Sequence, residues 1–213
     1  MKKKILFSAM TIALVGALIG GGIYAYFSDV ETSTDNTFTA GTLDLTVDTE
    51  NPWTSTKITA DNMKPGDSGA VDCTLNNVGN LAGTLTADIN TLVDTQGSCT
   101  EPECVDEGGT YSGGSCTGNI AVNLSTKMDI VVWVDDGAGG GTANNGVKDG
   151  TEEQLFSGTL AAADAAGPWS VTGGLGAGST TYIGISYSIA TTVTNEIQDD
   201  NSTFTIEFNL GQA

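Results

Sequence analysis

The chain has 213 residues and a formal net charge of −19 at neutral pH, with 26 acidic residues, seven lysines and no arginine or histidine. This acidic excess excludes nucleic acid and anionic lipid surfaces as partners, and the lack of histidine excludes H-E-x-x-H zinc sites and Ser-His or Cys-His nucleophiles. Abundant Gly, Thr, Val and Ile beside few helix-favouring residues predict a single all-β domain.

The first 25 residues have the layout of a secretory signal. Three lysines at residues 2–4 precede an apolar run to Ile23, and the small residue Ala25 follows. A positive start, an apolar middle and a small residue at the cut are typical of a signal peptide. We therefore predict a signal peptide at residues 1–25 with cleavage after Ala25, which leaves 4 lysines against 26 acids and a formal charge of −22.

The alternative for this leader is an anchor that is not cleaved, because about 20 apolar residues can span a bilayer. With cleavage after Ala25, Ile23 stands at position −3, where signal peptides usually have a small residue. The size of Ile23 therefore supports the anchor. The glycines at residues 20–22 weaken a permanent helix and favour cleavage. Under both interpretations, the membrane is a partner only through the precursor leader.

Residues 26–37 follow the cleavage site without a spacer, and their polar, Thr-rich sequence alternates like a β-strand. A free β-capable arm at the start of an exported β protein is a device that joins one subunit to the next. We predict that this arm is a donor strand. Tyr26, Phe27 and Val30 are its candidate contact residues.

Residues 38–213 have the pattern of a β domain, in which apolar and polar residues alternate between turn signals such as Pro65-Gly66. The predicted strands cover residues 38–47 (with a bulge near Gly41), 71–75, 81–89, 120–124, 128–134, 155–160, 180–190 and 202–210. The strand at 128–134 is apolar throughout and is expected at the centre of a sheet, with Trp133 in the core. A short helical turn is expected at AAADAA. About eight or nine strands favour a two-sheet sandwich of the jelly-roll type.

Four cysteines in an exported chain predict two disulfides. They are Cys73, Cys99, Cys104 and Cys116, and the last three lie in a Gly/Ser/Cys-rich insertion at residues 95–118. Three pairings are possible. Because Cys73 is on the inward face of its predicted strand, we expect it to tether the insertion to the domain. A zinc site of four thiolates is the alternative, which the lack of any C-x2-C pair disfavours.

The loop from residue 135 to residue 153 combines oxygen ligands with flexible glycines. Its candidate ligands are Asp135, Asp136, Asn145, Asp149, Glu152 and Glu153. Oxygen ligands at short spacing that end in a glutamate are what Ca²⁺ requires. We therefore predict a structural Ca²⁺ here and no other cofactor, with a solvated acidic turn as the alternative. Asn123 and Asn201 begin Asn-x-Ser/Thr tripeptides and are candidate glycosylation sites.

Three stretches carry a family resemblance: GGGIYAYFSDVETSTDNTFTAGTLDLTV from Gly20, MKPGDSGAVDCTLNNVGNLAGTLTADI from Met63, and the terminal STFTIEFNLGQA. In combination they resemble the TasA/camelysin family, secreted proteins of bacterial and archaeal biofilm matrices. The resemblance implies a jelly-roll fold and a role in a biofilm matrix fibre or a bundling pilus. Camelysin-type relatives are often labelled metalloproteases, but without histidine that label does not transfer. The segment from Gln96 to Cys116 is not part of the pattern.

We therefore predict a non-enzymatic, secreted structural subunit of an extracellular filament, polymerised by donor-strand complementation. The arm of one subunit fills the open sheet edge of the next, and such a contact does not close but propagates into a fibre. The expected partner is the chain itself, head to tail. The alternative is a monomeric secreted or surface-anchored binding domain whose arm folds back on its own sheet. A hydrolase is disfavoured, since paired acids arise by chance in so acidic a chain.

Overall fold

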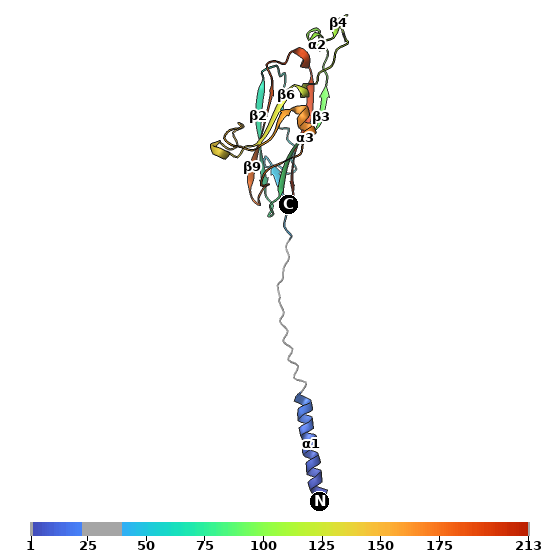
Figure 1. Cartoon of the computed structure of the whole chain (residues 1–213), viewed down its shortest axis with the longest axis vertical. Helices are drawn as coiled ribbons and strands as arrows, with labels where there is room; N and C mark the ends of the chain where they lie inside the picture. The colour runs from blue at the N-terminus through green and yellow to red at the C-terminus, as the bar shows by residue number, and fades with distance from the viewer. Residues whose placement is uncertain (1, 23–39, 213) are drawn as a thin grey trace. The chain divides into compact units, whose positions relative to one another are not determined.

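The computed structural model describes residues 2–22 and 40–212, and it divides the chain into two units, Met1–Thr39 and Ala40–Ala213 (Figure 1). In the first unit the apolar leader forms helix α1 (Lys2–Gly22). Within the described ranges, no helix combines the length and the apolar character that crossing a membrane requires. The predicted cleavage after Ala25 and the predicted arm at 26–37 lie outside the described residues.

The second unit contains two antiparallel sheets and a separate small hairpin. The five-stranded sheet has the order β1 (Leu45–Val47), β2 (Ser68–Asn77), β9 (Thr180–Ile189), β6 (Met128–Val134) and β7 (Gln154–Thr159). The three-stranded sheet has the order β10 (Asn201–Gly211), β3 (Thr84–Thr95) and β8 (Trp169–Ser170). The hairpin pairs β4 (Thr110–Ser112) with β5 (Ser115–Thr117). The prediction of an all-β fold with antiparallel sheets is confirmed.

Short helices connect these strands. They are α2 (Glu101–Asp106), α3 (Leu160–Ala166) and the 3₁₀ turns η1 (Leu124–Thr126), η2 (Ala138–Gly140) and η3 (Asn195–Ile197). α3 is the helical turn expected at AAADAA, and its N-cap Thr159 accepts a hydrogen bond from Ala162 N. Thr and Ser favour this position because they satisfy a backbone N–H that has no partner at the start of a helix.

One apolar core lies between the two sheets, and the strand alternation explains it. Inward-facing residues of β3, β6 and β9 are almost fully buried, among them Ile89, Ile130 and Ile183. Trp133 is 1% exposed and faces Gly184 across the β6–β9 pair. A Cβ at residue 184 would overlap the indole ring, so glycine there makes room for the tryptophan. Trp133 is thus buried, as expected, but it lies on the outer face of the sheet, with Gly184 and Asp72, and not in the apolar cluster between the sheets.

Three predicted strands differ from the observed ones. Within the described part of 38–47, only β1 is a strand; the segment before it follows the turn at 78–81, where Asn80 N donates to Thr42 O at 3.0 Å. β3 begins at Thr84 rather than at residue 81. Residues 120–124 form no strand, because the carboxylate of Glu107 takes the N–H of Val122 at 2.8 Å. β6 lies inside its sheet, but β9 is the central strand.

The cysteine insertion and the chain termini of the β domain lie at opposite ends. Figure 1 shows α2 and β4 at one end and the C-terminus at the other. The segment that enters the domain is near the C-terminus too, since Thr42 bonds to the 78–81 turn and Gly83 lies against Gly211. The insertion therefore projects from the end of the domain that is remote from the C-terminus and from the first described residues of the domain.

Candidate functional site

One long side of the sandwich is open, between β1 and β10. β10 pairs with β3, and within residues 40–212 no strand pairs with its other edge. β1 has three residues and pairs only with β2. On the opposite side, α3 connects β7 to β8 and buries Leu160 and Ala163, which closes that side of the core. The domain thus has one covered side and one exposed edge of backbone hydrogen-bonding groups.

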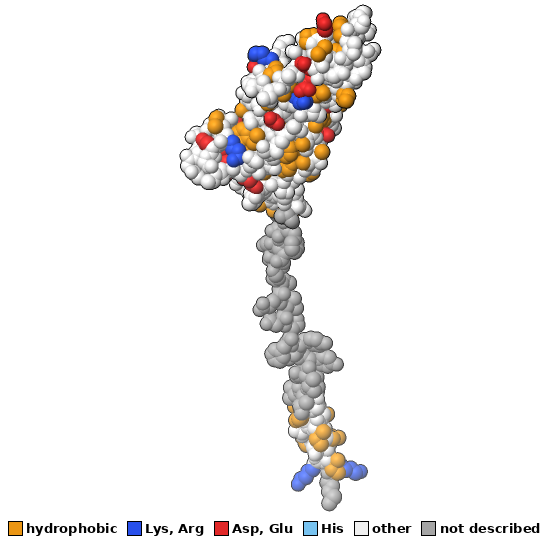
Figure 2. Space-filling model, turned by 45° about the horizontal axis from the view of Figure 1, so that its top comes forward, with side chains coloured by type: hydrophobic (Ala, Val, Ile, Leu, Met, Phe, Trp, Pro, Cys, Tyr) orange, Lys and Arg blue, Asp and Glu red, His pale blue; other side chains and the backbone are white. Residues whose placement is uncertain are grey.

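Two cavities follow β10 along this open side. The larger, of about 970 Å³, lies beside its first half and includes Met63, Met128 and Phe204 in its wall. The smaller, of about 400 Å³, lies between the β1 region and residues 206–210. We call these two cavities together the β10 groove. Figure 2 shows that apolar side chains gather in patches on the face of the domain that it draws.

The wall of the β10 groove is an apolar face that is only partly covered. The inward-facing residues of β10 are Phe204, Ile206, Phe208 and Leu210, and all four are half-buried. In the neighbouring strand β3, Leu85, Ala87 and Ile89 are at most 2% exposed. Both strands belong to the same sheet and face the same core, so the apolar face of the edge strand β10 is less covered than that of the central strand β3.

Trp53 stands at the smaller cavity and holds an unused hydrogen-bond donor. Its ring centroid lies 5.7 Å from that of Phe208. Its Nε1 is buried and has no acceptor among the described residues. A buried indole N–H normally finds a partner, but among the described residues neither Trp53 nor Trp133 has one. The sequence does not reveal Trp53 as a site residue, because a lone tryptophan in a loop carries no periodic signal.

The cysteines do not pair as expected. Cys104 and Cys116 form a disulfide that joins α2 to β5, while Cys73 and Cys99 are free. Cys73 is 0% exposed on the inner face of β2, and burial raises the pKa of its thiol to about 12. The expectation of two disulfides, one of them from Cys73 to the insertion, is wrong because the sheets enclose Cys73 in the core.

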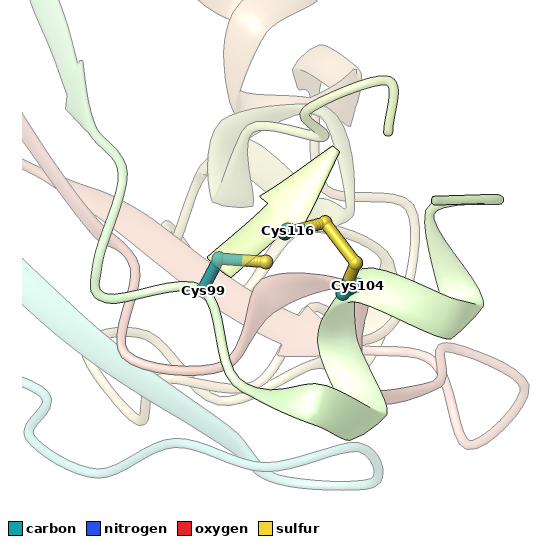
Figure 3. Close-up of side chains that lie close together, drawn as sticks. All are labelled: Cys99, Cys104 and Cys116. Carbon is teal, nitrogen blue, oxygen red and sulfur yellow. A yellow bond between two sulfur atoms is a disulfide. The ribbon is translucent and has the colours of Figure 1, made fainter. Parts of the chain in front are cut away.

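The remaining three cysteines lie together in the insertion. Their sulfur atoms are all within 4.8 Å of one another, and they are the only group of three or more Cys, Asp or Glu side chains at such distances in the described part of the chain. Figure 3 shows the Cys99 sulfur directed toward the disulfide. A Cβ at Gly109 would lie 2.9 Å from each sulfur of the disulfide, so this glycine leaves the space that the bond occupies.

The acidic loop folds over the outer face of the five-stranded sheet, and its carboxylates bind its own backbone. Asp135 is 0% exposed, and its Oδ2 accepts from the N–H groups of Asn145 and Gly146, each at 2.9 Å. Glu152 accepts from Gly137 N at 3.0 Å and from Asp149 N at 2.9 Å. These bonds organise the loop in the way that a bound ion otherwise would.

The six predicted calcium ligands do not converge as one set. Asn145, Asp149 and Glu152 share hydrogen bonds, and Asp135 binds the backbone of Asn145. Two others point elsewhere: Asp136 accepts from Ala138 N at 3.0 Å, and Glu153 accepts from Thr172 N. The donors in the loop thus already occupy most of these oxygens.

Asp72, on β2, lies under the acidic loop, and we call Asp72 and this loop together the acidic corner. The sequence did not reveal that Asp72 belongs to it. Gly146 of the loop lies over its carboxylate. One oxygen of Asp72 and one of Asp135 are buried without a hydrogen-bond partner among the described residues. Burial and the adjacent Asp135 raise the pKa of Asp72 to about 6. Glu152 adds a smaller rise, and the positive charge of Lys57 opposes it. The alternation of β2 predicts only that Asp72 faces outward, because it is a polar residue between apolar neighbours.

Asp72→Asn is expected to stabilise the domain at pH 7 to 8. The folded state holds the Asp72 proton more tightly than the unfolded state, whose pKa is near 3.8. The stabilisation from this proton is therefore fully present below about pH 4 and is lost as the pH rises through about 6. Thermal melting from pH 4 to 8 in the presence of a chelator, so that no divalent cation contributes, should show the variant's advantage growing with pH. Asp129→Asn, at an exposed position of β6, is the control, and a lower melting temperature of Asp72→Asn at pH 8 would contradict the assignment.

Three of the four lysines of the β domain form ion pairs within it. Lys57 pairs with Asp48, Lys64 with Asp67 and Lys127 with Glu196, each at 2.8 Å. Lys148 makes no ion pair within the described residues. Both candidate glycosylation residues, Asn123 and Asn201, are exposed.

Comparison with known proteins gives two findings. A family model described as Camelysin metallo-endopeptidase matches residues 1–136. A curated protein of Bacillus subtilis (strain 168), named Major biofilm matrix component, is 44% identical over 82 residues. That match covers 38% of this chain and 30% of the relative, so the chain aligns with less than a third of the relative's length.

Proposed function

Because the chain belongs to the TasA/camelysin family, we propose that it is a structural subunit of an extracellular filament, polymerised by donor-strand complementation. The observation that carries this proposal is the β10 groove. An 11-residue edge strand has one unpaired edge, and its apolar face is only half-buried. The arm at residues 26–37 has 12 residues, which is the length that such a strand requires.

In the proposed mechanism, the arm of one subunit enters the β10 groove of the next. Its backbone pairs with the free edge of β10. Tyr26 and Val30, which share one face of an extended strand, cover Phe204 to Leu210, and Phe27 lies on the other face. Trp53, in the wall of the smaller cavity, forms part of the surface that the arm covers. Because donor and acceptor surfaces differ, the contact is heterologous and repeats without closing, which builds a fibre from a single kind of subunit.

The jelly-roll topology is part of this proposal. Two antiparallel sheets with long-range pairs, β2 with β9 and β3 with β10, support it. So does the open side, where a strand from outside would complete the smaller sheet. The donor strand at residues 26–37 would extend the order β10-β3-β8 by one strand.

We propose that the chain acts outside the cell, in a biofilm matrix fibre or a bundling pilus, and without catalysis. The relative named Major biofilm matrix component supports the location and the structural role. The family model carries a metallo-endopeptidase description. However, the chain has no histidine, so neither the H-E-x-x-H ligands nor a His-based nucleophile can be assembled from it. The leader would keep the arm from acting before export.

A monomeric secreted or surface-anchored binding domain is the second candidate. The segment of the chain that enters the β domain passes the smaller cavity, where Leu43 and Leu45 form part of the wall. An arm that begins there could fold back and fill the groove of its own domain, which would leave no free edge. Negative-stain electron microscopy of the exported protein separates the candidates. Long, unbranched fibres are expected, whereas isolated particles at high protein concentration would favour the monomer.

We also propose that Ca²⁺ binds at the acidic corner, through the unpaired oxygens of Asp72 and Asp135. Isothermal calorimetry at pH 8 is expected to show saturable Ca²⁺ binding, and chelation should lower the melting temperature even in high monovalent salt, which already screens repulsion. Asp72→Asn should remove the saturable binding, while Asp129→Asn should retain it. The absence of saturable heat with the intact protein would reduce the corner to a self-bonded loop.

A further inference from the structure

The three cysteines of the insertion are held close together by separate elements. Cys99 lies between β3 and α2, Cys104 is in α2, and Cys116 is in β5. All three sulfurs are within 4.8 Å of one another, although only Cys104 and Cys116 are bonded. Figure 3 shows the free thiol of Cys99 beside the disulfide.

We propose that Cys99, Cys104 and Cys116 form a thiol–disulfide exchange centre, in which one S–S bond moves among three sulfurs. The Cys99 thiolate attacks the Cys116 sulfur, and the Cys99–Cys116 bond forms as the Cys104–Cys116 bond breaks. Cys104 leaves with the electron pair and takes up the proton that Cys99 released. Attack at Cys104 instead leaves Cys116 as the free thiol. Neither step consumes an oxidant or a reductant.

Local structure places Cys99 for this reaction. Thr100 is the N-cap of α2, and its N–H donates to Glu103 Oε2 at 3.0 Å, which attaches the residue after Cys99 to the helix that carries Cys104. Thr100 Oγ1 also donates to Gln198 Oε1 at 2.7 Å. Hydrogen bonds of Thr100 thus attach the segment that carries Cys99 to α2 and to Gln198, which follows the η3 turn. Cys99 is half-buried, so solvent base can reach its thiol.

The exchange is confined to these three residues. Cys73 is enclosed in the core and has its thiol pKa raised to about 12, so it cannot take part while the domain is folded. Burial, followed by the charges of Glu103 and Glu107, also raises the pKa of Cys99. Since the thiolate is the attacking species, exchange should be slow at neutral pH and faster in alkali.

The consequence is that the insertion always presents one free thiol, but at a position that changes. With the observed disulfide it is Cys99, which is half-buried; in the isomers it is Cys104 or Cys116. The Cys104–Cys116 bond ties α2 to the hairpin, whereas the Cys99–Cys104 bond would release the hairpin from α2. The centre therefore couples the mobility of the hairpin to the location of one S–S bond.

Disulfide mapping of the exported full-length mature protein tests this proposal. The protein is incubated at pH 7, 8 and 9 with a chelator and without oxygen, quenched in acid, labelled with N-ethylmaleimide and digested without reduction. Mass spectrometry is expected to find the label at Cys99, Cys104 and Cys116, together with crossed disulfides that include Cys99. The rate at which they appear should rise about tenfold per pH unit below the thiol pKa.

Single substitutions provide the controls. Cys99→Ser should lose all labelling of Cys104 and Cys116, while Cys73→Ser should leave the exchange unchanged. Cys104→Ser should form a Cys99–Cys116 disulfide under mild oxidation, and Cys116→Ser should form a Cys99–Cys104 disulfide. A wild-type protein that keeps only Cys104–Cys116 after prolonged incubation at pH 9 would overturn the proposal. Three free thiols with one equivalent of zinc would overturn it too, in favour of a thiolate metal site.

Discussion

Deletion of residues 26–37 is expected to abolish fibres and to leave a secreted β domain. The deletion removes the proposed donor strand but none of the residues that form the two sheets or their core. The β10 groove then stays empty, and its uncovered apolar face makes the monomer prone to aggregate. Electron microscopy should show no ordered fibres, while far-ultraviolet circular dichroism retains the β spectrum of the intact protein.

A synthetic peptide of residues 26–37 provides the matched control for the deletion. Added in trans, it should occupy the groove of the truncated domain, raise its melting temperature in a concentration-dependent way and still give no fibres. A peptide of the same composition in scrambled order should do neither. Ordered fibres of normal width from the truncated protein would refute donor-strand assembly.

Phe208→Ala is expected to disrupt assembly far more than it destabilises the domain. Phe208 lies on the inward face of β10, packs against Trp53 and forms part of the groove wall. Phe156, on β7, is a matched residue on the side that α3 closes: it is also half-buried and stacks on Trp169, with ring centroids 5.0 Å apart. Each alanine variant should lower the free energy of unfolding by about 1.5–3 kcal/mol.

Only the Phe208 variant should lose fibres. Because the two variants lose similar apolar contact, urea unfolding of their arm-deleted forms should give similar midpoints. Sedimentation of the full-length forms should distinguish the two, since fibres of the Phe156 variant pellet and the Phe208 variant stays in solution. The arm peptide should also bind the Phe208 variant more weakly than the Phe156 variant. Equal fibre yield from both variants would contradict the assignment of the groove as the acceptor surface.

The long strands of the domain could be predicted from the sequence because their alternation coincides with burial. β2, β6, β9 and β10 all lie within a few residues of their predicted positions. The errors occur where a particular contact overrides the local pattern. Residues 120–124 have strand-like composition, but the carboxylate of Glu107 accepts the N–H of Val122 and the backbone carbonyl of Glu107 accepts the N–H of Ile120. β8 has two residues, which is too short for any periodic signal.

The candidate site was less accessible to prediction. Alternation showed which face of β10 is apolar, but not that β10 is an edge strand, because that depends on pairing with β3 more than a hundred residues earlier. The cysteine count predicted disulfides, yet the actual pairing depends on the sheets that enclose Cys73. The acidic loop was recognised from its composition. Its contact with Asp72 was not, since the two are brought together only by the fold.

The pairing of lysines with neighbouring acids has a consequence for the mesh that the proposed fibres would form. Three of the four lysines beyond the leader neutralise carboxylates of their own domain, so hardly any positive charge remains on the surface to bind another subunit's acids. A fibre of such subunits is a polyelectrolyte with a fixed density of negative charge, surrounded by mobile counterions. A mesh of these fibres would behave as a cation-exchange gel. It would swell in dilute media, contract when multivalent cations replace sodium, and retard the diffusion of cationic solutes through the matrix.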